Sequence, residues 1–391
     1  MKLAFILFDY FPFGGLQRDC LRIARCCASR GHTVTLLART WEGAQPEGAG
    51  VSVELFGRRG FSNASRNRHF IAQLTAVLPT RAFDGVVGFN KVPGVDVYYG
   101  ADPCYAAKVR RLRPAWYRWL PRVRYFEAME RGVFGRGQKT ELLLLKDTEI
   151  PAYQEFYGTE IERFHVLPPG IARQALGAGE RARIRERVRQ QNGWPAGESV
   201  LLFVGSGFRI KGLDRVIEGL ASLSGADQPR ARLVVIGQGK PGPFARQAER
   251  LGVAGQVQFL GGRHDVLDFM IAADLLVHPA YSENTGTILL EALTVGLPVL
   301  TTEVCGFAFH IVKAQAGMVL PLPFRQEEFN RELARILRSE EMPAWRSRGL
   351  AYAGWEDLYS CDLRATEIIE QTIKRKQQVT TAGKLSALPP L

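Results

Sequence analysis

The sequence predicts an α/β protein built from two Rossmann-like domains of similar size. A short apolar run, a glycine-containing turn and an amphipathic helical pattern follow one another over residues 2–27, and the same order starts again over residues 199–220. Further apolar runs alternate with helical patterns after both openings, which is typical of parallel sheets covered by helices on both faces. We therefore expect the two domains to face a central cleft that binds a ligand.

Length and composition place the chain among globular proteins. It has 391 residues, of which 46% are hydrophobic and 23% charged, and this excludes disordered, collagen-like and disulfide-stapled classes. No apolar run approaches the roughly 18–20 residues that span a bilayer, and the first strand is followed by Asp9 and aromatic residues rather than a cleavage site. The six cysteines form no C-x-x-C pair, as expected of buried thiols in a reducing cytoplasm.

We predict the first domain at residues 1–172 and the second at residues 173–355. The Arg-rich stretch 180–191, near the start of the second domain, is typical of a linker with a solvated helix. Residues 356–376 predict a terminal helix that returns to the first domain, and the polar residues 377–391 predict a flexible tail. The expected strands of the first domain are 2–8, 33–38, 51–56, 85–89, 95–99, 141–145 and 164–167, and those of the second are 199–205, 232–236, 257–260, 275–278 and 298–302.

Adjacent glycines, Gly14 and Gly15, stand between the first strand and the first helix. Because they lack a Cβ atom, backbone N–H groups there can approach an anion, and the helix dipole adds to the attraction. A tight turn without a ligand explains the pair equally well. The spacing is not G-x-G-x-x-G, so the dinucleotide fingerprint is absent.

The second domain opens on a similar turn, residues 205–212, which carries Arg209 and Lys211 among glycines. Arginine can contact two oxygens at once and lysine supplies a compact charge, so the pair suits a diphosphate. Lys211 precedes a glycine with no hydroxyl residue after it, which makes an ATPase P-loop a poor match. Two surface cations on a turn are the alternative.

The segment 278–293 carries the most information. A strand ends at His278, a loop presents Glu283, and Thr285, Gly286 and Thr287 open a helix on which Glu291 lies one turn later. Two carboxylates beside a helix N-terminus could hold hydroxyl groups while the exposed amides bind phosphate. An acidic residue at a helix start is also an ordinary partner of the helix dipole.

These residues resemble a known family. The E-x7-E spacing from Glu283 to Glu291, followed by G-L-P-V-L at 296–300, is similar to the donor-site signature of retaining glycosyltransferases of family 4, which have the glycosyltransferase-B fold. The resemblance to the lipopolysaccharide core glucosyltransferases of Gram-negative bacteria extends over nearly the whole chain. It is carried by F-P-F-G-G-L-Q-R-D at 11–19, V-G-F-N-K-x-P-G-x-D-V-Y at 87–98, L-P-P-G-I at 167–171 and A-A-D-L-L-x-H-P-A-Y at 272–281.

The resemblance implies an enzyme that moves a hexose, most often glucose, from a UDP-sugar to a heptose of the lipopolysaccharide inner core, with retention of configuration. It implies that Glu291 holds the ribose, Glu283 the hexose and Lys211 the diphosphate, that Arg263 contacts uracil, and that Asp19 orients the acceptor. The implied donor-binding residues are Gly14, Gly15, Arg209, Lys211, Arg263, Glu283, Asn284, Thr285, Gly286, Thr287 and Glu291, and the implied catalytic residues are Glu283, Lys211, Asp19 and Asp102.

Two positions depart from the family pattern. Arg209 stands two residues before Lys211 rather than beside it or several residues ahead, so its phosphate role does not transfer directly. Where many members have a histidine that contacts the hexose, this chain has Asp102 nearby as a substitute acceptor. The sequence also lacks D-x-D and any spacing of metal ligands, so we expect fixed cations and helix dipoles to neutralise the diphosphate without a metal or other cofactor.

Much of the net charge of +12 comes from the segment 104–136, where basic and aromatic residues are interleaved. This pattern suits an anionic membrane surface. Solvated arginines on a helix packed against the first domain are the alternative, and nucleic-acid binding is disfavoured because no matching motif accompanies the charge. The expected membrane-facing residues are Lys108, Arg110, Arg111, Arg113, Trp116, Tyr117, Arg118, Trp119, Arg122 and Arg124.

We therefore expect a glycosyltransferase that is peripheral on the cytoplasmic face of the inner membrane. Its expected partners are a UDP-sugar, the inner-core heptose acceptor and the anionic membrane surface, but not nucleic acid. A related family 4 enzyme that acts on another glycolipid or polysaccharide is the nearer alternative. A non-catalytic sugar-nucleotide-binding membrane scaffold is the other, and the intact Glu283, Glu291 and Lys211 argue against it.

Overall fold

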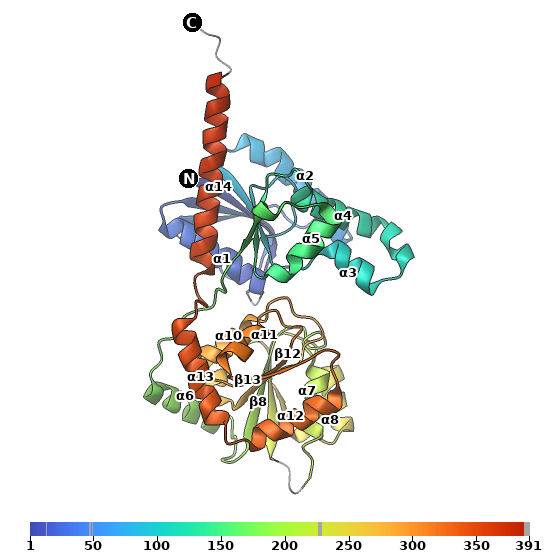
Figure 1. The fold of residues 1–391 in the computed structure, drawn as a ribbon, viewed down its shortest axis with the longest axis vertical. Coiled ribbons are helices and arrows are strands. Elements are labelled where there is room, and N and C mark those ends of the chain that lie inside the picture. Colours follow the sequence, from blue (N-terminus) through green and yellow to red (C-terminus); the bar gives the residue numbers. More distant parts are fainter. Residues whose placement is uncertain (13, 47, 49, 226–228, 387–391) are drawn as a thin grey trace. The chain divides into compact units, whose positions relative to one another are not determined.

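The structure is a computed structural model that describes residues 1–12, 14–46, 48, 50–225 and 229–386. The chain divides into two compact units (Figure 1): unit 1 comprises Met1–Gly170 with the C-terminal segment from Ser360, and unit 2 comprises Ile171–Tyr359. The chain passes from unit 1 to unit 2 after Gly170, two residues before the predicted boundary at 172. It passes back to unit 1 at Ser360 rather than at residue 356.

Unit 1 contains a seven-stranded sheet in the order β3-β2-β1-β4-β5-β6-β7, with parallel pairing throughout. Its strands are β1 (Lys2–Tyr10), β2 (Thr33–Trp41), β3 (Val51–Leu55), β4 (Gly85–Gly88), β5 (Val97–Gly100), β6 (Glu141–Leu144) and β7 (Phe164–Val166). The chain order reverses between β1 and β4, and ligands bind at such a point beyond the carboxyl ends of the strands.

Helices cover both faces of this sheet because successive side chains of β1 point to opposite sides. Leu3 and Phe5 pack toward α1 (Gly15–Ser29) and α14 (Cys361–Ser386), whereas Ala4 and Ile6 pack toward the helices on the other face. Those helices are α2 (Asn63–Val77), α3 (Tyr105–Leu112), α4 (Pro121–Phe134) and α5 (Ile150–Tyr157). Short 3₁₀ turns are η1 (Leu78–Thr80), η2 (Ala115–Trp119), η3 (Asp147–Glu149) and η4 (Ile161–Arg163).

Helix α14 corrects the predicted end of the chain. It packs along α1 and buries Ile369 and Ile373, as expected of a helix that returns to unit 1. It begins at Cys361 rather than 356 and continues to Ser386, so residues 377–386 are helical and not a flexible tail. No proline interrupts the helical hydrogen bonds before residue 389. Residues 387–391 lie outside the described part of the chain.

Unit 2 contains a six-stranded parallel sheet in the order β10-β9-β8-β11-β12-β13. Its strands are β8 (Ser199–Val204), β9 (Ala231–Ile236), β10 (Val257–Phe259), β11 (Leu275–His278), β12 (Val299–Thr302) and β13 (Gly317–Leu320). One face of the sheet is covered by α6 (Ala178–Gln191), α9 (Val266–Ala272), α10 (Thr287–Thr294), α11 (Ala308–Ala314) and α13 (Met342–Trp355). The other face is covered by α7 (Leu213–Ala221), α8 (Gly242–Arg250) and α12 (Gln326–Arg338). A 3₁₀ turn, η5 (Ala254–Gln256), precedes β10. The predicted fold class of two Rossmann-like domains is confirmed.

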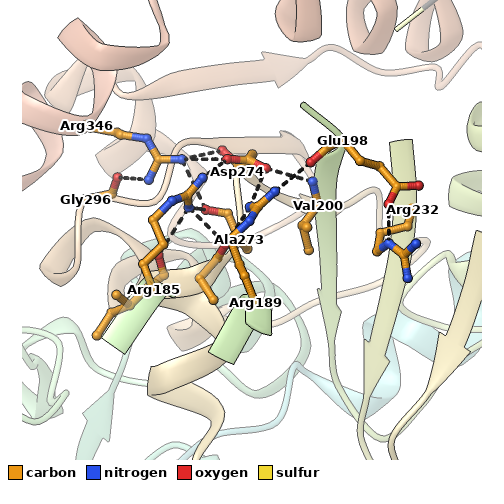
Figure 2. Close-up of polar contacts among 11 residues, drawn as sticks. Arg185, Arg189, Glu198, Val200, Arg232, Ala273, Asp274, Gly296 and Arg346 are labelled. Carbon is orange, nitrogen blue, oxygen red and sulfur yellow. Dashed lines mark hydrogen bonds and ion pairs between the residues drawn. The ribbon is translucent and has the colours of Figure 1, made fainter. Parts of the chain in front are cut away.

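A group of arginines around Asp274 joins the helices of unit 2 to the amino end of its sheet (Figure 2). Arg189 and Arg346 lie 3.1 and 3.4 Å from the Asp274 carboxylate, Arg185 contacts it as well, and the backbone N–H of Val200 donates to it at 2.8 Å. Burial raises the pKa of Asp274. The charge of Arg185 and the hydrogen bond from Val200 lower it by more, so the net shift of the pKa is downward. This cluster stabilises the fold at the edge opposite the predicted ligand site.

None of the helices in the described ranges combines the length and apolar character that a membrane span requires.

Candidate active site

Three residues from different segments of unit 2 meet at the carboxyl edge of its sheet. Lys211, in the turn between β8 and α7, forms an ion pair with Glu283, in the loop after β11. His278, the last residue of β11, is buried, and its Nε2 atom lies 3.3 Å from the same Glu283 oxygen. The parallel sheet brings these positions together because the carboxyl ends of β8 and β11 are adjacent.

The carboxylate of Glu283 is strongly stabilised in its ionised form. Burial raises its pKa, but the hydrogen bond with His278 and the charge of Lys211 lower it more, to about 2. An ionised carboxylate only accepts hydrogen bonds, so Glu283 can bind hydroxyl groups of a ligand. The Lys211 side chain remains 23% exposed and can meet a ligand anion from the same turn.

Backbone contacts hold the two loops against each other. The backbone N–H of Tyr281 donates to the carbonyl of Ile210 at 2.8 Å. Gly212 has φ = 80°, and a Cβ atom there would lie 2.1 Å from the carbonyl oxygen of Pro279. Only glycine combines this backbone conformation with so close an approach. The glycine after Lys211 is therefore explained by loop packing, without any need for a phosphate-binding loop.

Arg209 lies on the same turn, but its partner is a residue that sequence analysis missed. Its guanidinium group pairs with Asp214 on α7 at 3.1 Å, and the hydroxyl of Tyr281 donates to the same carboxylate oxygen at 2.8 Å. The Arg209 side chain is nevertheless 75% exposed. The contact with Asp214 restrains its position without burying it, and its predicted phosphate role stays a prediction.

Helix α10 begins beside Glu283. Gly286 precedes its first turn with φ = 80°, a conformation that favours glycine. The carbonyl of Thr285 accepts a hydrogen bond from the backbone N–H of Phe307 at 2.7 Å, which fixes the loop before the helix. Glu291 is half-buried and follows Thr287 by one helical turn, as predicted. The E-x7-E segment, with Asn284 inside it, therefore spans one loop and one helix.

Arg263 lies after β10 and is held by a neighbour. Its guanidinium group forms two hydrogen bonds of 2.7 Å with the Asp265 carboxylate and lies 4.7 Å from the centre of the Phe269 ring. The contact with uracil implied by the resemblance stays a prediction.

Unit 1 carries the remaining predicted site residues. The carboxylate of Asp19 accepts a hydrogen bond from the Tyr99 hydroxyl at 2.7 Å and pairs with Arg22 at 3.0 Å. Burial raises the pKa of Asp19 and outweighs the charge of Arg22 and the Tyr99 hydrogen bond, which lower it. Asp19 is thus a half-buried side chain that Tyr99 and Arg22 hold in place.

The two glycines at the start of α1 differ from each other. A Cβ atom on Gly14 would lie 1.9 Å from the side-chain oxygen of Gln17, whereas one on Gly15 would meet nothing within 4 Å. Gln17 in turn donates to the carbonyl of Asp9 at 3.0 Å. Gln17 therefore occupies the space that the first glycine leaves, and only Gly15 borders open space.

Asp102 lies away from these residues, in a second feature of unit 1. It lines a cavity of about 350 Å³ whose wall also carries Lys91, Lys108 and Arg122. Its contact with the donor sugar stays a prediction. Of the predicted residues in unit 2, Lys211 and Glu283 contact each other, whereas Arg209 and Arg263 pair with other acidic residues. In unit 1, Asp19 and Asp102 have different surroundings. The ligand cleft between the domains stays a prediction.

The basic segment 104–136 divides into buried and exposed parts. Val123 of α4 is buried, whereas Trp116 and Trp119 of η2 are 63% and 68% exposed. Arg118 lies 5.3 Å from the Trp119 ring. The alternative in which the aromatic residues of this segment pack on the domain is thus wrong for these two tryptophans.

His278 is a functional candidate that the sequence analysis does not predict, because a histidine at the end of a core strand is also typical of a structural residue. Its position five residues before Glu283, at the carboxyl end of a strand, is the signal that could have identified it. Within the described residues, no group of three or more His, Cys, Asp or Glu side chains is arranged to hold a metal ion. Activity without a metal stays a prediction.

Known glycosyltransferases are similar to this chain in sequence. Residues 184–348 match the family model described as glycosyl transferases group 1. The chain is 45% identical over 371 residues to the lipopolysaccharide glucosyltransferase WaaG of Escherichia coli K12. The aligned region covers 94% of this chain and 98% of that protein. A D-inositol 3-phosphate glycosyltransferase of Nocardiopsis dassonvillei is 32% identical over 222 residues, or 54% of this chain and 50% of the relative.

Two solved structures extend the comparison. The crystal structure of WaaG superposes with a TM-score of 0.89, covering 94% of this chain and 99% of that one. Anabaena HepE in complex with UDP-glucose, at 17% identity, shares the fold with a TM-score of 0.72 and coverage of 96% and 100%.

Proposed function

The chain belongs to the family of the lipopolysaccharide glucosyltransferase WaaG, within the group 1 glycosyltransferases, and from that premise we propose that it transfers glucose from UDP-glucose to a heptose of the lipopolysaccharide inner core. The observation that carries the proposal is the contact of Lys211 and His278 with one oxygen of Glu283 at the carboxyl edge of the unit 2 sheet. This edge is where nucleotide ligands bind in parallel α/β sheets.

In this proposal the predicted donor-site residues of unit 2 have separate tasks. Lys211 neutralises the diphosphate, with Arg209 and the backbone amides at residues 285–287 adding further positive potential. Glu283 accepts hydrogen bonds from the hexose, and Glu291 accepts those of the ribose. The pKa of Glu283, about 2, supports its role because the carboxylate remains an acceptor at any physiological pH.

We further propose that the reaction retains anomeric configuration and needs no metal, as the family resemblance implies. The departing phosphate oxygen then helps to remove the proton from the attacking hydroxyl, and no separate protein base is required. The absence of a D-x-D motif supports fixed cations as the source of charge stabilisation.

The acceptor of such an enzyme is attached to a lipid, so we propose that the protein works as a peripheral protein on the cytoplasmic face of the inner membrane. The exposed Trp116 and Trp119 beside Arg118 support this, because tryptophan and arginine together favour the interface of an anionic bilayer.

A transfer assay with purified protein tests the proposal. Chelator-treated protein is given UDP-glucose, UDP-galactose or UDP-N-acetylglucosamine together with deacylated inner-core oligosaccharide, and the product is analysed by mass spectrometry and by the anomeric coupling of the new sugar. We expect one added glucose with retained configuration. Transfer only to an unrelated glycolipid or polysaccharide would favour the alternative family 4 activity, and no UDP binding to the chelated protein would overturn the proposal.

A further inference from the structure

The cavity in unit 1 lies where a parallel sheet offers its ligand site. Of the strands that border it, β1 contributes Phe8, and the loops after β4 and β5 contribute Lys91 and Asp102. Strands β1 and β4 are the neighbours between which the chain order reverses. The cavity, of about 350 Å³, therefore occupies the switch point of the unit 1 sheet and has the volume of a small-ligand site.

One cation of the wall is already neutralised. Lys91 pairs with Glu130, which is completely buried, and Glu130 also accepts hydrogen bonds from the Tyr157 hydroxyl at 2.6 Å and the backbone N–H of Tyr105 at 2.9 Å. These contacts hold the Lys91 ammonium group and the Glu130 carboxylate in place. Lys91 forms a rigid side of the cavity and adds no net charge to it.

The other two cations of the wall are not neutralised in this way. Neither Lys108 on α3 nor Arg122 on α4 forms an ion pair within the described residues, and the guanidinium group of Arg122 lies 5.8 Å from the centre of the Phe126 ring. Among the described residues that line the cavity, Asp102 is the only acid. With the Lys91–Glu130 pair neutral overall, the wall retains one positive charge in excess.

This wall has the chemistry of a site for an acidic sugar. Arginine and lysine bind a phosphate or carboxylate, Asp102 and the amide of Asn67 bind hydroxyl groups, and Phe126 offers an apolar surface to a sugar ring. We propose that the cavity binds an acidic sugar of the acceptor, whose phosphate or carboxylate is held by Lys108 and Arg122. The inference rests on the proposed function, which supplies a saccharide acceptor. It specifies in addition that the acceptor sugar bound by unit 1 is acidic.

The proposal gives two of the expected membrane-facing residues a different role, in the cavity. The sequence places Lys108 and Arg122 among the basic residues of the segment 104–136. In the structure both line the cavity, whereas Trp116 and Trp119 of η2 are exposed and are not part of its lining. A soluble acceptor, assayed without membranes, therefore isolates the role of the two cations.

The test compares Lys108→Gln and Arg122→Gln with Lys139→Gln in the full-length protein. Lys139 is exposed, lies outside the cavity and forms no ion pair within the described residues, so its substitution removes the same charge elsewhere in unit 1. The acceptor is deacylated inner-core oligosaccharide, used intact, after dephosphorylation or after carboxyl reduction. Binding of the oligosaccharide and of UDP is measured by calorimetry beside the transfer kinetics.

We expect each cavity variant to weaken binding of the intact oligosaccharide, and to raise its KM, by about tenfold, the loss of one charge-assisted hydrogen bond. The affinity for UDP and kcat should stay unchanged, and Lys139→Gln should match the wild type. The difference should vanish with one treated acceptor, which identifies phosphate or carboxylate as the group bound.

Two results would overturn the inference. One is equal binding of the intact oligosaccharide by all four proteins, and the other is a loss by the cavity variants that is the same with the dephosphorylated and the carboxyl-reduced oligosaccharide as with the intact one. The proposed function fails separately. If the wild type transfers no sugar to the oligosaccharide while the two cavity variants still bind it more weakly, the cavity inference stands and the proposed reaction does not.

Discussion

The Nε2 atom of His278 lies 3.3 Å from the Oε2 atom of Glu283, the same oxygen that Lys211 contacts. A core strand thereby orients an acidic side chain in a surface loop, since His278 is the buried last residue of β11. Glu283 is held by its neighbours before any ligand arrives. This arrangement accounts for its low pKa and underlies the first three predictions.

Lys211→Ala and Glu283→Ala should each lose most transfer activity and still fold. Lys211 supplies the fixed charge for the diphosphate, and Glu283 supplies an acceptor for hexose hydroxyls, so each loss should cost a hundredfold or more, on the order of 3 kcal/mol. UDP-glucose turnover and thermal unfolding measure the two effects. Arg250→Ala, at an exposed position of α8, is the control and should remain active. Wild-type turnover by either site variant would refute the site.

The Glu283 carboxylate should stabilise the protein in a pH-dependent way. Its pKa is lowered from 4.5 to about 2 in the folded protein, so its contribution is complete above pH 4.5 and declines as the pH falls toward 2. Linkage gives a contribution of about 3 kcal/mol at neutral pH. The measurement is the urea midpoint of wild type and Glu283→Gln between pH 7 and 3. The difference between the two should shrink below pH 4.5, and a constant difference would contradict the prediction.

His278→Phe should lower turnover without preventing UDP binding. The substitution keeps a buried ring but removes the hydrogen bond that orients Glu283, an interaction with a charged group worth about 1.5–3 kcal/mol. We expect kcat to fall about tenfold or more, while calorimetry gives a UDP affinity near that of the wild type. His278→Gln retains a donor and should recover part of the rate. Equal rates for the Phe and Gln variants would argue against the orienting role.

Asp274→Asn should destabilise unit 2 strongly. Three arginines surround this carboxylate, and removal of its charge leaves them to repel one another (Figure 2). Breaking a buried pair costs about 3–5 kcal/mol and an exposed pair contributes about 0–1 kcal/mol. Asp274 is half-buried, so we expect a loss between these values, about 2 kcal/mol. Asp268→Asn is the matched control, because its pair with Arg187 is much more exposed. Urea unfolding should separate the two variants, and equal midpoints would disprove a structural role for the cluster.

Replacement of Trp116 and Trp119 by serine should weaken binding to anionic vesicles. The two exposed rings should lie at headgroup depth beside Arg118, and the arginines of the segment should make binding decline with salt. Co-sedimentation with anionic and neutral vesicles measures the effect. Trp355→Ser removes a ring that is 70% exposed but lies in unit 2, and it should bind as the wild type does. Equal pelleting with both kinds of vesicle would exclude the proposed surface.

Much of the fold could be predicted because hydrophobic period and glycine position are local properties. The alternation of Leu3, Ala4, Phe5 and Ile6 between the two faces of β1 follows directly from a parallel strand buried on both sides. The ends of α14 could not be predicted in the same way. Its start at Cys361 depends on where the chain crosses back to unit 1, and its length depends on packing against α1.

The chemistry of the candidate site could likewise be predicted from the sequence. The E-x7-E spacing and Lys211 between glycines are local patterns, and together with the family resemblance they predict a sugar-nucleotide site. The partners of these residues were not visible, because His278, Asp214 and the cavity residue Lys91 are brought to their contacts by the order of strands in the sheets. The Arg-rich stretch 180–191 shows the same limit. Its pattern predicted a solvated helix, yet Arg185 and Arg189 bind Asp274 more than eighty residues away. Residue types and their spacing set which chemistry is available, whereas charge pairing depends on distances that exist only after the chain has folded.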